Sequence, residues 1–269
     1  MGRLFWSLLF VAVGVLAQIS PPSHAFWYLV LAVTEWGHWL MVPILLIWLP
    51  GWQATGIGKL AALLALVAAG LVLTPVWKAR GYAQVIQTEV PKLVGSVTLP
   101  ATGEVPVRTA PLVLKDLIQG VDTPSIQWRS QWYAKRGERD LEMDIYMPPL
   151  GAPRLGTRPD HPVVLVLHGG MMGPPWQSGD RQEALSLNRY LAGRGYVVVA
   201  IDYRLATEAP YPAALEDVLE ALKSLKGMGG VGGMDPSRVI LLGRGGGAHL
   251  ALMAAYASGD PSIRGVSAL

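Results

Sequence analysis

The residues of this chain with the clearest potential for chemistry lie in a glycine-rich turn, LLGRGGGAHLAL at Leu241–Leu252. An apolar segment enters the turn and a helix-forming segment leaves it. Junctions of this kind serve two unrelated sites: a dinucleotide phosphate cradle of the G-x-G-x-x-A type, and the sharp turn that presents the nucleophile of a serine hydrolase. The two interpretations require different surroundings for the turn.

The dinucleotide interpretation has a match in Gly243, Gly245 and Ala248. That pattern belongs after the first strand of a sheet, with an acidic residue about 20 positions further on to hold the ribose. Here the turn follows the third buried apolar run, and the printed sequence ends before a second strand could place that acid. The surroundings therefore argue against a nucleotide cofactor, and we expect none.

The apolar patterning around the turn predicts an α/β architecture. Residues 126–134 and 141–149 alternate like two antiparallel strands joined by the charged turn KRGERD. Three continuous apolar runs then alternate with helical spacing, which indicates a mostly parallel sheet with helices on both faces. The expected buried strands are 161–167, 196–204 and 238–243, and the expected helices are 181–194, 211–225 and 246–258. IRGVSAL at Ile263–Leu269 resembles the start of another buried strand, so we expect a domain that is incomplete at its C-terminal side.

Small-residue turns that offer backbone N–H groups can hold an oxyanion during acyl transfer, and HGG at His168–Gly170 is such a turn. With this motif, the chain from about Gln127 to Leu269 resembles the α/β-hydrolase esterases and lipases of the hormone-sensitive-lipase-like and related carboxylesterase group. The matching segments are LEMDIYMPP, HGG with Trp176 and Gly179–Asp180, DYRLA at Asp202–Ala206, YPAALEDV at Tyr211–Val218, DPSRV at Asp235–Val239, and GRGGGAHLAL at Gly243–Leu252.

The resemblance implies an α/β-hydrolase fold and an oxyanion hole formed by the N–H groups of Gly169, Gly170 and Gly246. It also implies a supporting role for His168, Gly243 and Gly247. In that family the nucleophilic serine falls on Gly245, which has no oxygen with which to attack. We therefore expect a carboxylic-ester hydrolase type of protein that is catalytically inactive as printed, seen through a shortened or altered sequence. The alternative is a membrane-tethered pseudoenzyme that binds acyl ligands or acts as a scaffold.

No other residue of the sequence stands at a position where it could replace the missing nucleophile, acid or base. The remaining serines in this half lie outside any strand–turn–helix junction, and His249 and Asp260 do not occupy the family's catalytic positions. We expect a carboxylate of the LEDV helix to support a loop, and His168 to prop its turn. No spacing of the H-E-x-x-H kind is present, so no metal is expected. The residues considered were Ser178, Ser237, Ser258, Ser267, Glu216, Asp217, and the histidines His24 and His161, expected to be exposed.

The first 80 residues have the composition of a membrane anchor. Three apolar runs, about 4–19, 26–49 and 57–77, approach or exceed the ~20 helical residues that cross a bilayer, and we predict three transmembrane helices. A cleaved signal peptide ending at SHA, Ser23–Ala25, is the alternative for the first run. Ala61, Ala65 and Ala69 form a small-residue ridge that favours close helix packing. Glu35 and His38 lie three residues apart in the second span, where we expect them to pair with each other or face a neighbouring helix; an ion relay is the alternative.

Charge and cysteine content limit the partners. Residues 1–80 hold four basic residues and one acidic residue, so the formal net charge of +3 belongs to the anchor and the remainder is balanced. A nucleic-acid partner is therefore not expected; the expected partners are the lipid bilayer and a small acyl ester. The absence of cysteine excludes disulfides. We expect an anchor over 1–80, a connector over 81–125 with a short helix near Leu112–Gly120, and a hydrolase-like domain over 126–269, on the extracytoplasmic side.

Overall fold

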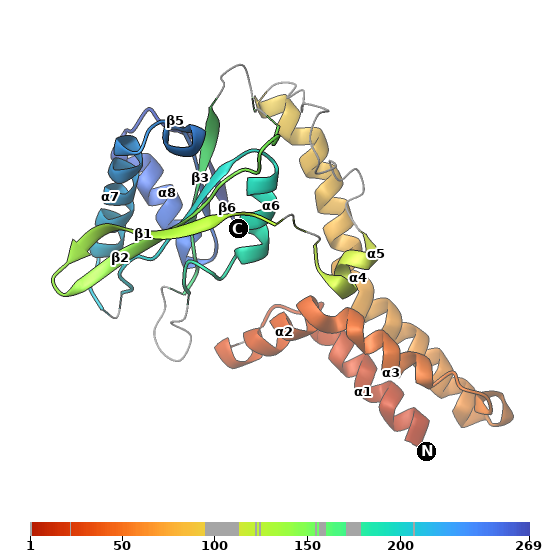
Figure 1. The fold of residues 1–269 in the computed structure, drawn as a ribbon. Coiled ribbons are helices and arrows are strands. Elements are labelled where there is room, and N and C mark those ends of the chain that lie inside the picture. The colour runs from red at the N-terminus through yellow and green to blue at the C-terminus, as the bar shows by residue number, and fades with distance from the viewer. Residues whose placement is uncertain are drawn as a thin grey trace. The chain divides into compact units, whose positions relative to one another are not determined.

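The computed structural model describes residues 2–21, 23–94, 113–121, 123, 125–153, 155, 160–170, 179–206 and 208–269. The chain divides into two compact units, which are considered separately (Figure 1). The first comprises Met1–Val97 with Arg108–Val113, and the second comprises Thr98–Val107 with Leu114–Leu269.

The first unit is helical. Its elements are α1 (Gly2–Leu16), α2 (His24–Trp36), the 3-10 helix η1 (Gly37–Leu40), α3 (Met41–Leu46), the 3-10 helix η2 (Trp52–Ala54) and α4 (Gly56–Val94). Two segments, Phe26–Leu46 and Gly56–Ile86, are long and apolar enough to cross a membrane by length and composition. The expectation of three such helices is therefore not met. Helix α1 has 15 residues and so spans roughly 22 Å, and a turn at residues 17 and 18 follows it.

Helices α1 and α4 pack through small residues. Ala61 and Ala65 are completely buried, which confirms the predicted ridge at these two positions, while Ala68 rather than Ala69 completes it. A Cβ atom on Gly14 would lie 2.7 Å from Cβ of Leu71, so only glycine fits at that crossing. The Ser7 hydroxyl donates a buried hydrogen bond of 2.8 Å to the Ala61 carbonyl. Close backbone approach and a hydrogen bond therefore fix this helix pair.

Helix α4 continues through Pro75, which has no N–H to donate to the carbonyl of Leu71. Two side chains take its place at that carbonyl. The Thr74 hydroxyl donates to it over 2.6 Å and the Gln18 side-chain amide donates over 3.2 Å. The same Gln18 amide also donates to the Thr74 hydroxyl over 2.9 Å. The proline is therefore accommodated by a polar cluster contributed partly by the segment that follows α1.

Two further expectations for the first unit change. Helix α4 extends to Val94, beyond the predicted start of the connector at residue 81. The polar segment after Trp77 is therefore helical and not part of an irregular connector. Glu35 is exposed and His38 Nε2 is buried without a hydrogen-bond partner. Within the described part of the chain these two side chains form no hydrogen bond or ion pair with each other, so the first of the two expected arrangements, mutual pairing, is wrong. Residues 95–112 of the connector lie outside the described residues.

The second unit contains a six-stranded mixed sheet in the order β1-β2-β4-β3-β5-β6. Its strands are β1 (Trp128–Arg136), β2 (Arg139–Tyr146), β3 (His161–Leu167), β4 (Val197–Ile201), β5 (Met234–Gly243) and β6 (Ile263–Ala268). β1 and β2 pair antiparallel, as do β2 and β4, whereas β4, β3, β5 and β6 are parallel. The predicted α/β fold with an antiparallel edge is confirmed. The short α5 (Leu114–Gln119) precedes the sheet, within the segment where a helix was predicted.

Helices cover both faces of the sheet. Helix α6 (Leu185–Gly193) lies on one face, and α7 (Ala213–Gly227) and α8 (Gly246–Ser258) lie on the other (Figure 1). Every residue of β3 and β4 is buried, as expected for central strands enclosed on both sides. Helix α6 begins at Leu185 rather than at residue 181, because residues 181–184 form a turn. The 3-10 helix η3 (Val231–Gly233) leads into β5.

Candidate active site

Two loops that could take part in acyl transfer leave the sheet at the same level. Leu167, the last residue of β3, pairs with Gly243, the last residue of β5. The HGG turn therefore begins beside the turn that connects β5 to α8. Since β3 and β5 are parallel neighbours, both loops emerge at the carboxyl edge of the sheet, where open α/β sheets bind ligands.

The turn between β5 and α8 has the geometry of a nucleophile elbow with no side chain at its tip. Gly245 has φ 51° and ψ −117°, a conformation that strains any other residue. A Cβ atom on Gly245 would meet nothing within 4 Å. A Cβ atom on Gly243 would lie 2.2 Å from the Gly247 carbonyl oxygen, and one on Gly247 would lie 2.2 Å from the His168 carbonyl oxygen. Close packing thus requires glycine at 243 and 247, whereas a Cβ atom at 245 would meet none of the described residues within 4 Å.

The histidine of the HGG turn is held by the protein interior. His168 is buried, and its ring stacks on Tyr203 with centroids 4.4 Å apart. The Tyr203 hydroxyl donates to the His168 carbonyl over 2.7 Å. Burial raises the pKa of this hydroxyl, and the charge of Glu183 adds to the effect, so the tyrosine stays protonated and able to donate. His168 Nδ1 lies 2.6 Å from the Gly169 carbonyl oxygen. These contacts give His168 a role in shaping the turn.

The backbone donors of the site are not equivalent. The Gly169 N–H donates to Glu183 Oε2 over 3.0 Å, so this amide, expected in the oxyanion hole, already has an acceptor. Gly170 has φ 87° and follows it in the same turn. Among the contacts of the described residues, the N–H groups of Gly170 and Gly246 have no acceptor. Two of the three expected donors therefore have no acceptor among the described residues.

The other candidate catalytic residues lie in structural contacts. Ser237 donates to Asp235, and the Ser258 hydroxyl accepts from the Asp260 N–H. Burial alone would raise the pKa of Asp260, but hydrogen bonds from Lys226 and Ser262 outweigh it and lower that pKa. None of these groups contacts the elbow. Ser267 is part of β6, while Ser178 and Trp176 lie outside the described residues.

Three further histidines complete the account of the expected residues. His161 is buried rather than exposed, because it opens β3 and its Nδ1 lies 2.7 Å from the Gly195 carbonyl oxygen. His249 is exposed on α8, and its N–H approaches the Gly245 carbonyl oxygen at 3.5 Å. His24 falls within α2. No hydrogen bond links the ring of a described histidine to the turn between β5 and α8.

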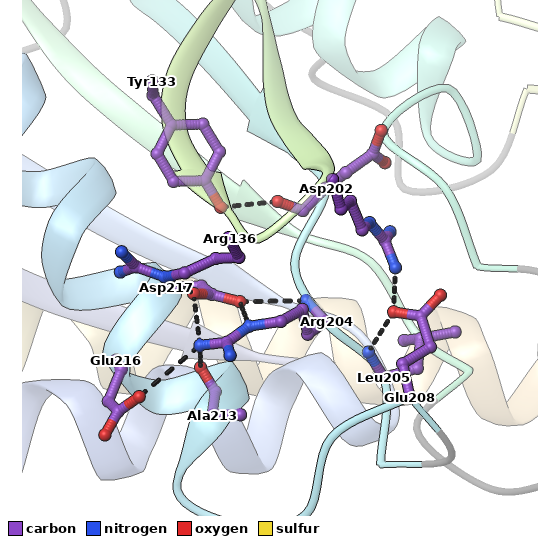
Figure 2. Close-up of polar contacts among 10 residues, drawn as sticks. Tyr133, Arg136, Asp202, Arg204, Leu205, Glu208, Ala213, Glu216 and Asp217 are labelled. Atoms are coloured by element: carbon purple, nitrogen blue, oxygen red, sulfur yellow. Dashed lines mark hydrogen bonds and ion pairs between the residues drawn. The ribbon is translucent and has the colours of Figure 1, made fainter.

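The carboxylate of the LEDV helix supports a loop, as expected. Asp217 is fully buried and accepts from Arg136 Nε over 2.9 Å and from Arg204 Nε over 2.8 Å (Figure 2). The Arg204 backbone N–H donates to the same carboxylate over 3.1 Å. Glu216, on the exposed face of α7, lies 3.4 Å from Arg204 Nη2. Asp217 thus anchors the loop after β4 to helix α7, and Tyr133 fastens the start of that loop by donating to the Asp202 carbonyl over 2.6 Å.

An ion-pair cluster around Arg181 was missed in the sequence. Its guanidinium contacts the carboxylates of Glu142, Asp144 and Asp202, with Nε 2.9 Å from Asp144 Oδ1. Asp144 is fully buried, and Ser130 also donates to it over 2.6 Å. Burial would lower the pKa of Arg181, but its hydrogen bonds to Asp144 and Asp202 raise it above the ordinary value, so the charge is permanent. The cluster fixes the segment that carries Glu183 against β2 and the end of β4.

A small apolar cavity lies close to the elbow. It has a volume of about 80 Å³ and is lined by side chains of the loop after β4, of α7 and of α8, among them Ala206, Leu215 and His249. His249 is four residues beyond Gly245, so the cavity borders the start of the elbow helix. A larger open groove of about 530 Å³ lies between Arg136 and α7 and contains none of the turn residues. The geometry combines free amide donors, open space at Gly245 and a nearby apolar recess.

Residues 143–267 match the BD-FAE family model. Carboxylesterase NlhH of Mycobacterium tuberculosis is 30% identical over 139 residues, which are 51% of this chain and 40% of NlhH. Esterase LipI of the same organism is 36% identical over 121 residues, which are 43% of this chain and 34% of LipI. The solved structure of EstE1, a thermophilic carboxylesterase cloned from a metagenomic library, aligns with a TM-score of 0.45 at 27% identity, covering 54% of this chain and 47% of EstE1.

The sequence matches show that the second unit is similar to carboxylic-ester hydrolases. The chain spans 40% of the length of NlhH and 34% of LipI. The matched range contains the HGG turn and the elbow, so the two turns whose geometry is described above lie within the part of the chain that resembles esterases.

Proposed function

We propose that this protein is a membrane-anchored α/β-hydrolase of the hormone-sensitive-lipase-like carboxylesterase group that binds small neutral acyl compounds and does not hydrolyse them in the form printed. The observation that carries the proposal is Gly245: it holds the strained backbone geometry of a nucleophile elbow, with open space where a side chain would project. The similarity of residues 143–267 to esterases supports the ligand class.

Loss of the nucleophile leaves the binding elements in place. The N–H groups of Gly170 and Gly246 are free to donate to a carbonyl oxygen, and the recess beside α8 can take a short apolar chain. A carbonyl held by two backbone donors is polarised, but no group attacks it. His168 is engaged by Tyr203 and the Gly169 carbonyl, and His161 by the Gly195 carbonyl, so we expect neither to act as the base for a serine placed at 245.

A turnover assay and a binding assay test this proposal together. The 269-residue chain in detergent micelles should hydrolyse p-nitrophenyl butyrate no faster than micelles alone, and Gly245→Ser should stay near the same background. Butyramide, a neutral and stable acyl compound, should bind, as measured by ligand-observed NMR. Gly245→Phe should abolish that binding by filling the open space, while Gly259→Phe should not.

Gly259 provides a matched control because it also has a positive φ, 58°, and open space around its Cβ position. Hydrolysis clearly above background by the unaltered chain would refute the proposed inactivity. Butyramide binding that survives Gly245→Phe would refute the position of the acyl site.

We further propose that the first unit anchors the protein in a lipid bilayer. Many of its large apolar side chains are exposed, which favours a hydrocarbon environment, and two of its segments have the length and composition to span one. The Arg3 side chain bonds the Pro50 carbonyl, so this residue and Lys59 lie toward one end of the helix pair. We propose that the second unit lies on the extracytoplasmic side. This orientation does not rest on charge, because Lys78, Arg80 and Lys92 follow the other end of the span and oppose Arg3 and Lys59.

A further inference from the structure

One acidic residue of the site has no role in the proposed binding of neutral acyl compounds. Glu183 lies in the turn before α6, where its N–H donates to the Asp180 carbonyl over 3.1 Å. Its two carboxylate oxygens contact both loops of the site. Oε2 accepts from the Gly169 N–H over 3.0 Å, and Oε1 lies 3.4 Å from Arg244 Nη1. The carboxylate thus bridges the HGG turn and the elbow.

The position of this charge bears on what the site can bind. A Cβ atom on Gly169 would lie 3.7 Å from both Glu183 oxygens and 3.4 Å from the Arg244 carbonyl oxygen. The carboxylate therefore contacts Gly169 and Arg244, which precede Gly170 and Gly245 in the chain. An anionic group brought to the Gly170 amide would meet a like charge in a partly buried setting, where Coulomb interactions are stronger than in water.

The nearby Arg244 does not remove the repulsion between Glu183 and an anionic ligand. Arg244 is the positive group facing Glu183, and its side chain is 44% exposed. While the ion pair is formed, the guanidinium is engaged by the carboxylate. Removing the carboxylate charge would both abolish the repulsion and release Arg244 to attract an anion. The two consequences act in the same direction.

We propose that Glu183 determines the charge specificity of the acyl site: it excludes anionic acyl compounds and leaves the site to neutral ones, such as esters and amides. This inference rests on the proposed acyl-binding function. It names Glu183 as a specificity-determining residue rather than a catalytic one, because its carboxylate acts on the charge of the ligand and not on a reacting bond. A free carboxylate, the product of ester cleavage, would be expelled by the same charge.

The test compares butyramide with butyrate, which have similar shape and differ in charge. Binding to the full chain in detergent micelles is measured by ligand-observed NMR for the unaltered protein and for Glu183→Gln. The glutamine keeps an oxygen that can accept from the Gly169 N–H, so the turn stays braced while the charge is removed. We expect butyrate to bind Glu183→Gln at least about tenfold more tightly and butyramide to change by less than about twofold.

Glu220→Gln is the matched control, since Glu220 pairs with Lys223 at three-residue spacing on α7, outside the site; it should leave both affinities unchanged. Arg244→Gln in the Glu183→Gln background should reverse most of the gain in butyrate affinity. A butyrate-to-butyramide ratio that is the same in Glu183→Gln and the unaltered chain would overturn this inference and leave the acyl site standing. If neither compound binds any variant, the proposed acyl site itself is wrong, and the inference falls with it.

Discussion

The difference between Gly245 and Gly247 gives the sharpest test of the elbow geometry. Alanine at 245 meets no atom within 4 Å, so its only penalty is the backbone conformation at φ 51°, roughly 1–3 kcal/mol. The lower entropy of an alanine-containing unfolded chain offsets roughly 0.4–1 kcal/mol of this. We therefore expect Gly245→Ala to lower the free energy of unfolding by about 0 to 2.5 kcal/mol.

Alanine at 247 has a different cost. Its Cβ atom would lie 2.2 Å from the His168 carbonyl oxygen and 2.3 Å from that of Leu167, and neither backbone atom can move without displacing β3. We expect a loss of at least about 4 kcal/mol, in the range of disruptive core changes. For a domain of this size each kcal/mol lowers Tm by roughly 2–4 °C.

Thermal unfolding of the full chain in detergent, followed by circular dichroism, should therefore separate the two variants. Gly245→Ala should unfold within about 10 °C of the unaltered protein, and Gly247→Ala should unfold at least about 3 °C lower than Gly245→Ala or fail to fold. Gly259→Ala serves as a second positive-φ control with open space. If Gly245→Ala were as damaging as Gly247→Ala, the space above Gly245 would not be open, and the reasoning that assigns it the nucleophile position would be refuted.

Three further predictions concern the charged groups. Asp217→Asn should lower the free energy of unfolding by about 3 kcal/mol, because it leaves two partly buried arginines without their counter-charge; Glu216→Gln, at an exposed position, should change it by less than about 0.5 kcal/mol, and equal effects in chemical denaturation would contradict the loop-anchoring role. The depressed pKa of Asp260 contributes stability that is present at neutral pH and is lost as pH falls from about 4 through the folded-state pKa, so the stability deficit of Lys226→Met should shrink over that acidic range; a deficit independent of pH would exclude the ion pair as its source. Because the chain has no cysteine, Lys223→Cys gives a single label site, and an impermeant maleimide should modify it in intact cells; labelling only after lysis would place the second unit in the cytoplasm.

The sheet and its helices could be predicted because each is encoded locally. The run at His161–Leu167 is apolar throughout, which indicates a strand buried on both faces, and the structure buries all seven residues. The elbow was equally visible, because its glycines have a fixed spacing between a strand and a helix. Local patterns of this kind need no knowledge of what packs against them.

The contacts of Arg181 and Glu183 could not be predicted in the same way. Arg181 meets carboxylates from β2 and from the end of β4, which lie tens of residues away along the chain. No spacing rule links such positions, since the sheet order brings them together. Glu183 likewise contacts the HGG turn and the elbow only after β3 and β5 have paired. Tertiary ion pairs of this kind become visible only in the folded protein.

The helix lengths in the first unit differed for physical reasons that composition does not show. The run at residues 4–19 is apolar enough for a span, but the helix ends at Leu16, ahead of Pro21 and Pro22. Conversely, Pro75 does not end α4, because side chains satisfy the carbonyl it leaves free. Hydropathy measures the preference of a segment for lipid and does not report whether its backbone bonds can be completed.

The polar cluster at Pro75 also bears on the order in which the first unit assembles. Before Gln18 reaches the Leu71 carbonyl, the Thr74 hydroxyl is its described side-chain donor, and in the bilayer that we propose for this unit an incompletely bonded carbonyl would be costly. Packing of α1 against α4 therefore stabilises the pair by more than the buried contact area alone would give. This extra stabilisation is available only in the register that brings Gln18 level with Leu71. A proline that would weaken an isolated helix thus favours one register of the α1–α4 pair. We therefore expect a substitution of Gln18 to be tolerated better when Pro75 is replaced as well.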